Sequence, residues 1–417
     1  MNQPRFANSA MHSSGRHQRR TFIRQMGSGF FGLALLHRRE HLFAAEATGQ
    51  AKRCLVLWMD GGPSQWETFD PKPGTERGGP TKVVQTRTPG IHFAEGLPRM
   101  ALHSESLAVI RNVRSPEGDH QRGTYLLHTG YRQIPGFPRP SLGSIISHEQ
   151  PTKQMPGHVA LGNGATFGPA YLGLDHAPFS IRSASESLAT FRRLQQRRGR
   201  IELVRSLSAE FDALHQDDAL RRRNQLLQQL DQLPETPFID ALDIAKESAR
   251  TRNLFGEGEF AESCLAGFRL LKAGLPFVEV QLSGWDTHTD NFRQTRDLCQ
   301  QLDRPWSAIM ETLAAEGMLQ ETLIVWMGEF GRTPRINAQN GRDHYPDVTP
   351  VVLAGGPIRG GRSIGATNET GAVDGESHAV ADVFATIFWA MGIDPQRQFT
   401  TEFGAPTQIT DGGNPIG

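Results

Sequence analysis

The chain has 417 residues with 44 Lys+Arg and 44 Asp+Glu, so its formal net charge at pH 7 is zero. This balance gives no electrostatic basis for binding nucleic acid or an anionic membrane surface. A hydrophobic content of 37%, with 44 glycines and 26 prolines, is typical of a globular α/β protein with many loops. The three cysteines are too few for a disulfide framework and lack metal-ligand spacing.

The N-terminal region has the features of an export signal. The stretch RRTFIR, residues 19–24, precedes a short apolar run and resembles a twin-arginine signal. The run is too short to span a bilayer, and AEA at 45–47 is a small-x-small cleavage site. We therefore expect a signal peptide over 1–47, read by the twin-arginine export machinery. The mature chain 48–417 is then expected in the bacterial periplasm or at the cell surface, without a transmembrane segment. A basic surface helix is the alternative.

Apolar strands alternate with helical segments along the mature chain. The pattern predicts strands at 54–59, 107–113, 276–283, 322–328 and 349–353, and helices at 302–316 and 378–393. This alternation predicts an α/β fold with a doubly wound, mostly parallel sheet and helices on both faces. Residues 185–265 are charged and helical in pattern, and we expect a helical insertion there that covers the ends of the strands.

Acidic residues and histidines recur where the predicted strands end. They are Asp60 after the first strand, Asp286 and His288 after the strand at 276–283, Glu329 after the next, Asp343 and His344 before the strand at 349–353, and Asp119 and His120 before a helical run. Carboxylates gathered at one edge of a sheet repel unless a cation or a proton neutralises them. Mixed carboxylate and imidazole ligands suit Zn²⁺, Mn²⁺ or Fe, whereas all-oxygen subsets suit Mg²⁺ or Ca²⁺. Helix caps or surface polar groups are the alternative for any one of these residues.

Glu329 ends an apolar strand, so its carboxylate needs a partner. A metal ion is the first expectation, and Arg332 or an imidazole such as His344 is the alternative. Arg332 and Arg122 are also candidates for pairing with a phosphate or sulfate group. The glycine pairs at 61–62 and 355–356 are candidates for presenting backbone N–H groups to the same anion.

Four motifs in this order resemble a known bacterial family. They are GGPSQWETFDPKP (61–73), GWDTH (284–288), GEFGRTPR (328–335) and GRDHYP (341–346). Together they resemble the family called domain of unknown function 1501, which is grouped with the alkaline phosphatase and sulfatase superfamily. The resemblance implies a doubly wound sheet, one or two metal ions at the strand ends and a nucleophile at a helix N-terminus, within a single domain over 48–417.

The resemblance also assigns roles to individual residues. Asp60, Asp286, His288 and His344 stand where the superfamily keeps metal ligands. Glu329 and Phe330 stand in place of a metal-binding Asp-His pair, so the second metal would lose an imidazole ligand.

The nucleophile of the superfamily has no direct counterpart in this chain. LLHTG at 126–130 resembles the run after a sulfatase nucleophile, and counting back from it reaches Asp119 or His120 instead of Cys or Ser. Thr124 is the nearest hydroxyl. A metal-activated water is the alternative nucleophile, with His120 or Glu329 as its base.

Two functions follow from these expectations. The first is an exported metal-dependent hydrolase, using Zn, Mn, Mg or Ca, that acts on a small-molecule or carbohydrate ester of phosphate or sulfate. The second is a non-catalytic member of the same superfamily that binds metal and serves as a binding or assembly protein at the cell surface.

Overall fold

The computed structural model describes residues 50–152, 155–195, 233 and 236–417. The predicted signal peptide lies outside these residues, as does the stretch 196–232 within the predicted insertion. All described residues belong to one structural unit, Glu40–Gly417. Within the described ranges, no helix combines the length and the apolar character needed to cross a bilayer.

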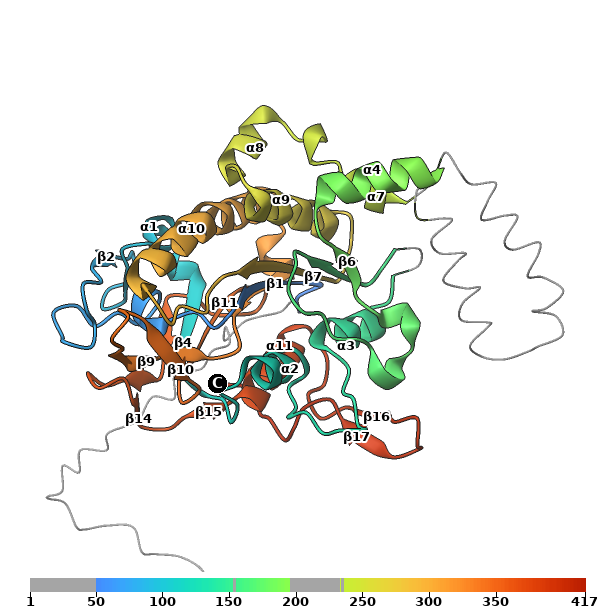
Figure 1. The fold of residues 1–417 in the computed structure, drawn as a ribbon. Helices are drawn as coiled ribbons and strands as arrows, with labels where there is room; N and C mark the ends of the chain where they lie inside the picture. Colours follow the sequence, from blue (N-terminus) through green and yellow to red (C-terminus); the bar gives the residue numbers. More distant parts are fainter. Residues whose placement is uncertain (1–49, 153–154, 196–232, 234–235) are drawn as a thin grey trace, which may run out of the picture. The chain divides into compact units, whose positions relative to one another are not determined.

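A mixed sheet of nine strands forms the centre of this unit (Figure 1). The strand order is β12-β4-β11-β8-β1-β7-β5-β6, and β15 also pairs with β4. Strand β11 runs antiparallel to both of its neighbours, β4 and β8, and the other pairs are parallel. The strands are β1 Arg53–Asp60, β4 Leu107–Arg114, β5 His158–Leu161, β6 Phe179–Ile181, β7 Phe277–Ser283, β8 Thr322–Met327, β11 Thr349–Gly355, β12 Arg362–Ile364 and β15 His378–Ala379. The predicted α/β fold with a mostly parallel sheet is confirmed.

Helices cover both faces of this sheet (Figure 1). In the central strand β1, Leu55, Leu57 and Met59 pack into one apolar core with residues of α1, α9 and α10. The alternate residues pack into the other core with residues of α2, α3 and α11. Burial on both faces explains why β1 is a continuous apolar run. The helices are α1 Pro98–Leu102, α2 His120–Thr129, α3 Leu142–Glu149, α4 Ala184–Gln195, α7 Pro237–Leu242, α8 Ala249–Phe255, α9 Glu259–Lys272, α10 Asn291–Ala315 and α11 Val380–Ala390.

Short hairpins and 3₁₀ turns complete the unit. The hairpins pair β2 Val83–Gln85 with β3 His92–Ala94, β9 Gly331–Ile336 with β10 Arg342–Tyr345, β13 Ala366–Thr367 with β14 Val373–Asp374, and β16 Gln398–Thr400 with β17 Pro406–Gln408. The 3₁₀ turns are η1 Gln65–Glu67, η2 Ser104–Ser106, η3 Ala170–Leu172, η4 Leu174–His176, η6 Ile244–Lys246 and η7 Leu319–Glu321.

The described parts of the predicted insertion are largely helical. They comprise α4, α7, α8 and the first half of α9, and α9 packs through Cys264 and Phe268 into the core beneath β7. These helices therefore contribute to the layer on one face of the sheet. The role of the insertion as a cover over the strand ends stays a prediction, because 196–232 lie outside the described residues.

The buried His158 in β5 makes stability depend on pH. Burial lowers its pKa from 6.5 to about 4, so the imidazole stays neutral in the folded chain while the unfolded chain takes up a proton below about pH 6.5. Stability should therefore fall as the pH drops from 7 to 4, by about 3 kcal/mol from this residue alone. Denaturant titrations of wild type and His158→Gln across this range check the prediction. The variant should lose less stability, and parallel curves would contradict it.

Candidate metal centre

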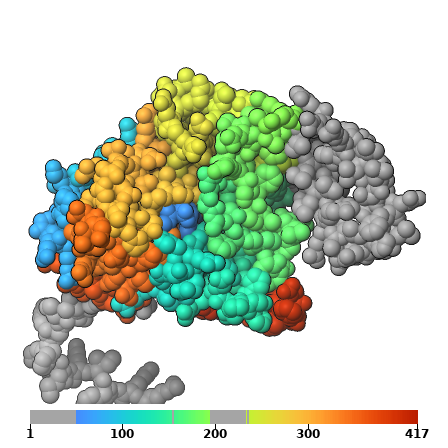
Figure 2. All heavy atoms as spheres, viewed as in Figure 1, coloured from blue at the N-terminus to red at the C-terminus, as the bar shows by residue number. Residues whose placement is uncertain are grey.

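The carboxyl ends of β1, β7 and β8 lie at one edge of the sheet, and the segments around them carry the polar residues that the motifs contain. Asp286 and His288 lie in the loop after β7, and Glu329 follows β8. His120 is the first residue of α2, and His344 lies in β10. In Figure 2, blue atoms from the region of β1 are visible at the bottom of a depression between the orange and teal segments.

His344 reaches this edge because β11 is antiparallel. Val351, near the start of β11, pairs with Met327 at the end of β8. The chain that enters β11, including β10, therefore lies beside the carboxyl ends of the parallel strands. At its other end β11 pairs Gly355 with Leu323, near the start of β8, so the glycine pair 355–356 lies at the opposite edge of the sheet.

Four side chains place their ligand atoms in one small group. One ligand atom from each of His120, Asp286, His288 and His344 lies within 4.8 Å of all the others. The Oδ1 atom of Asp286 lies 3.1 Å from His288 Nε2, 3.3 Å from His120 Nε2 and 3.4 Å from His344 Nε2. The two Nε2 atoms of His288 and His344 are 3.0 Å apart.

The other nitrogen of each imidazole faces an acceptor. Nδ1 of His120 lies 2.9 Å from Oε1 of Glu329, and Nδ1 of His288 lies 2.8 Å from Oδ1 of Asp343. Nδ1 of His344 lies 2.7 Å from the carbonyl oxygen of Gly118. With a proton on each Nδ1, the three Nε2 lone pairs point into the group. This arrangement, in which an acceptor fixes the tautomer of each ligand, is typical of metal-binding histidines.

The distances match a coordination shell better than a hydrogen-bond network. Ligand atoms at about 2.0–2.1 Å from a tetrahedral ion lie about 3.3 Å from one another. Nε2 of His120 is buried and has no hydrogen-bond partner among the described residues. Converging lone pairs repel one another unless a cation or a proton lies between them. The residues present therefore fit a divalent metal ion.

Arg332 holds the only carboxylate of this group of four. Its guanidinium is fully buried and donates to Oδ1 of Asp286 at 2.7 Å. It also donates to the carbonyl oxygens of Gly62 at 2.9 Å, Arg342 at 3.1 Å and Gly61. Burial alone would raise the pKa of Asp286, but the hydrogen bond from Arg332 outweighs it and the pKa lies below its usual value. Arg332 thus orients Asp286, and its guanidinium N–H groups donate to acceptors within the protein.

Glu329 is buried, with 1% of its surface exposed, and it supports the group from behind. Its Oε1 atom accepts from the backbone N–H of Gly61 at 2.9 Å and from His120. The hydrogen bond to Glu329 raises the pKa of His120. Of the partners expected for Glu329, the structure shows an imidazole, but it is His120 where the sequence suggested His344. Gly61 has φ +113°, and a Cβ there would lie 2.4 Å from the backbone nitrogen of Asp286, so only glycine fits.

Replacing Glu329 by Gln should weaken metal binding by about 10–100-fold, the usual effect of changing an outer-shell partner. The amide keeps the size of the side chain but removes the charge that supports His120. Competition with a fluorescent chelator measures the affinity. The control is Glu311→Gln, because Glu311 is an exposed carboxylate on α10. Equal affinities of the two variants would contradict the prediction.

The remaining candidate residues lie around this group. Asp119 caps α2, since its side chain accepts from the backbone N–H of Arg122 at 3.2 Å. Thr124 is buried within α2. Asp343 is exposed and orients His288, and its hydrogen bond with that imidazole lowers its pKa. Asp60 is half-buried at the end of β1, and its metal-binding role stays a prediction.

Three contributors to the site were not among the candidate site residues of the sequence analysis. The carbonyl of Gly118 holds His344, and Asn337 donates to Asp343 at 3.3 Å and to the carbonyl of His288 at 2.9 Å. The ring of Phe330 packs 4.5 Å from His344 and 5.2 Å from His120, measured between ring centroids. A backbone acceptor cannot be recognised from residue type, whereas the motif GEFGRTPR did mark Phe330 as a replacement for a histidine.

The fold and the site together define a class of protein. The chain has an α/β fold with a mixed, mostly parallel sheet, and it carries a group of three histidines and one aspartate suited to a metal ion. Similar solved structures include an alkaline phosphatase superfamily protein from Vibrio parahaemolyticus, with 9% identity, TM-score 0.41, and 83% of this chain and 67% of that chain covered. The PsFucS1 sulfatase from Pseudoalteromonas sp. has 13% identity and a TM-score of 0.36, and the match covers 82% of this chain and 68% of that chain. A mutant of TAB5 alkaline phosphatase has 14% identity and a TM-score of 0.39, and the match covers 83% of this chain and 99% of that chain. At these identities and TM-scores the likeness carries no conclusion about this chain.

Residues 51–417 match the family model described as "Protein of unknown function (DUF1501)". The chain therefore belongs to the DUF1501 family, as the four motifs indicated. No curated protein shows significant similarity to the sequence.

Proposed function

We propose that this chain is an exported metal-dependent hydrolase that acts on an ester of phosphate or sulfate, or on a related anionic substrate. The observation that carries the proposal is the convergence of three imidazole Nε2 atoms and one carboxylate oxygen within 4.8 Å. Between about a quarter and a half of each ligand side chain is exposed, from 23% for His344 to 45% for Asp286, so a small-molecule or carbohydrate ester can reach the group.

The donor set favours a particular class of ion. Three nitrogen donors and one oxygen donor suit Zn²⁺, Mn²⁺ or Fe, whereas Mg²⁺ and Ca²⁺ prefer oxygen ligands. Among the described residues there is one such group, so we propose a centre with a single ion. When bound, this ion supplies a Lewis acid that polarises an ester oxygen and lowers the pKa of a coordinated water.

The protein's own residues then have distinct roles. His120, His288 and His344 bind the ion, and Arg332 keeps Asp286 ionised and oriented toward it. Since the hydroxyl of Thr124 is buried, we propose water as the nucleophile. Glu329 is also buried, and its carboxylate is hydrogen-bonded to His120. Its role is therefore to position His120 as a metal ligand.

Two measurements test the hydrolase proposal. Elemental analysis of protein purified without added metal should find zinc, manganese or iron bound to the chain. The same preparation should hydrolyse an aryl phosphate or an aryl sulfate, lose this activity to a chelator and regain it with the metal. Metal without hydrolysis of either ester would favour the non-catalytic alternative, and protein without metal would overturn both functions.

Export rests on the stretch RRTFIR at 19–24. Replacing both leading arginines, Arg19 and Arg20, by lysine should retain the protein in the cytoplasm, as judged by cell fractionation of a bacterial host. Unchanged release to the periplasm or cell surface would contradict the use of the twin-arginine machinery.

A further inference from the structure

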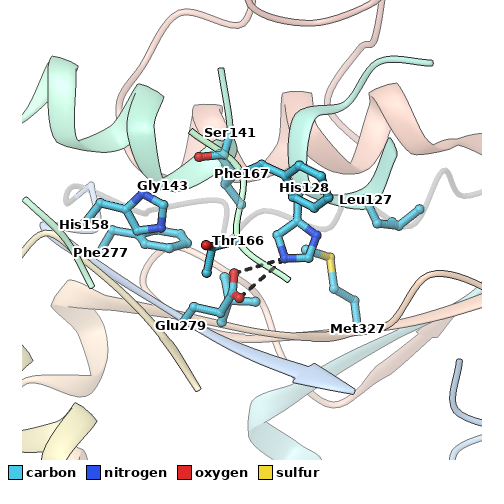
Figure 3. Close-up of a pocket in the computed structure, with 12 residues that line it drawn as sticks. Leu127, His128, Ser141, Gly143, His158, Thr166, Phe167, Phe277, Glu279 and Met327 are labelled. Carbon is cyan, nitrogen blue, oxygen red and sulfur yellow. Dashed lines mark hydrogen bonds and ion pairs between the residues drawn. The ribbon is translucent and has the colours of Figure 1, made fainter. Parts of the chain in front are cut away.

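A second cluster of buried ionisable side chains lies on the same face of the sheet as α2, outside the metal centre. Figure 3 shows His128, Glu279 and His158 around a small cavity of about 10 Å³, which Ser141, Thr166 and Phe167 also line. The three ionisable side chains are all at least 95% buried. Burying a carboxylate at such depth requires a compensating partner.

His128 is that partner. Its Nδ1 donates to the carbonyl oxygen of Thr124 at 2.7 Å, and its Nε2 lies 3.3 Å from one oxygen of Glu279 and 3.4 Å from the other. An imidazole that donates from both nitrogens is protonated, so the two side chains form a buried ion pair. Burial lowers the pKa of His128, but the charge of Glu279 outweighs it and the net pKa is raised. Gln281 adds a hydrogen bond to Glu279 at 2.6 Å.

His158 does not share this role. Its Nδ1 has no hydrogen-bond partner among the described residues, and burial keeps the imidazole neutral at pH 7. His158 also lies in β5, next to β7 in the same sheet, and its ring packs against Gly143 of α3, a helix that carries none of the four metal ligands. It therefore provides a control that shares the cavity with Glu279 but not the ion pair.

We propose that His128 and Glu279 form a positioning pair that holds α2 against β7 and thereby sets the spacing of the metal ligands. His128 lies in the last turn of α2, whose first residue is His120. Glu279 lies in β7, and the loop after this strand carries Asp286 and His288. The ion pair thus connects the two elements that carry three of the four ligands. This inference rests on the proposed function only in that it assumes a bound metal.

The physical reason is the cost of leaving one charge without its partner. Removing one member of a buried ion pair leaves an uncompensated charge, whereas replacing both by neutral groups costs much less. A buried carboxylate or imidazolium without its partner recruits water or displaces the helix or strand that carries it. Here the helix is α2 and the strand is β7, and both lead to metal ligands. Metal sites tolerate displacements of only about 0.5 Å, so a small shift of α2 weakens binding.

The test compares zinc affinity with stability in full-length variants, using Zn²⁺ itself as the probe. His128→Gln and Glu279→Gln should each bind zinc about 10-fold more weakly in competition with a chelator. The double variant, which buries no charge and can form an amide hydrogen bond, should recover to within about 3-fold of wild type. If a single Gln variant fails to fold, Glu279→Asp replaces it in the test. This variant keeps the charge but shortens the side chain, and it should also bind zinc more weakly than wild type.

Two controls separate positioning from a general loss of stability. Asp303→Asn alters another buried carboxylate, which accepts from the backbone N–H groups of Arg99 and Met100, and should lower stability without changing zinc affinity. His158→Gln should also leave zinc affinity unchanged. Unfolding midpoints measured with chelator present give the stability of each metal-free variant.

The possible results are distinguishable. Weaker zinc binding in the single variants, with recovery in the double variant, supports the positioning pair. Unchanged zinc affinity in the single variants, or the same loss of affinity in Asp303→Asn, overturns it and leaves the metal centre intact. Wild-type protein that binds no zinc, manganese or iron overturns the proposed function itself.

Discussion

Replacing His288 and His344 together by alanine should abolish metal binding and hydrolysis. The two Nε2 atoms lie 3.0 Å apart, and their removal leaves one imidazole and one carboxylate in the group. Two protein ligands do not hold a catalytic ion of the kind that three or four ligands bind. Changing a residue that only supports a ligand lowers metal affinity by up to about 100-fold, and the loss of metal affinity in this double variant should be larger. Elemental analysis and an ester hydrolysis assay measure the two losses.

The matched control for this change is His92→Ala. His92 is an exposed histidine in β3, outside the group of four. It should keep the metal and the activity of the wild type. Since the replaced side chains are partly exposed, the metal-free double variant should retain nearly the stability of metal-free wild type. Full metal content in the double variant would show that the ion, if present, lies elsewhere.

Replacing Arg332 by Met should destabilise the fold by at least about 3 kcal/mol and also weaken metal binding. The buried guanidinium satisfies the carbonyl oxygens of Gly61, Gly62 and Arg342, and each buried acceptor left without a donor costs about 1–3 kcal/mol. Asp286 would lose the hydrogen bond that lowers its pKa. Denaturant titration in the presence of a chelator isolates the effect on the fold, and a zinc titration measures the effect on the site.

Arg122→Met provides the comparison for Arg332. Arg122 is exposed and donates to Glu117 at 2.8 Å, a carboxylate that Arg132 also holds at 2.8 Å. Its loss should cost about 1 kcal/mol or less, because the guanidinium is exposed and Arg132 remains as a partner of the buried Glu117. Equal losses in the Arg332 and Arg122 variants would contradict the structural role assigned to Arg332.

The main elements of the fold were predictable because local patterns specify them. The apolar runs at 54–59, 107–113 and 322–328 correspond to β1, β4 and β8 with small shifts at their ends. The helix predicted at 302–316 is the second half of α10, which begins at Asn291. The short strands β5, β6 and β12 have only three or four residues, and segments of that length carry too few side chains for a periodicity.

The partners of the polar residues could not be predicted in the same way. Arg332 and Glu329 are separated by two residues, and Arg332 was an alternative partner for Glu329, yet Arg332 contacts Asp286 and Glu329 contacts His120. Both contacts join residues more than 40 positions apart in the chain. Pairing over such separations depends on which strands are neighbours in the sheet, and no local pattern contains that information.

The sequence by itself determined the alternation of strands and helices, the family and the set of residues from which a metal centre is built. Hydrophobic periodicity and residue type act locally, so they are readable in one dimension. The tertiary structure decided which of these residues meet. His344 precedes the sheet strand β11, and it joins residues that follow sheet strands because β11 runs antiparallel to β4 and β8. The direction of β11 depends on long-range backbone pairing. Because β11 is antiparallel, its amino end lies at the edge of the sheet where β7 and β8 end.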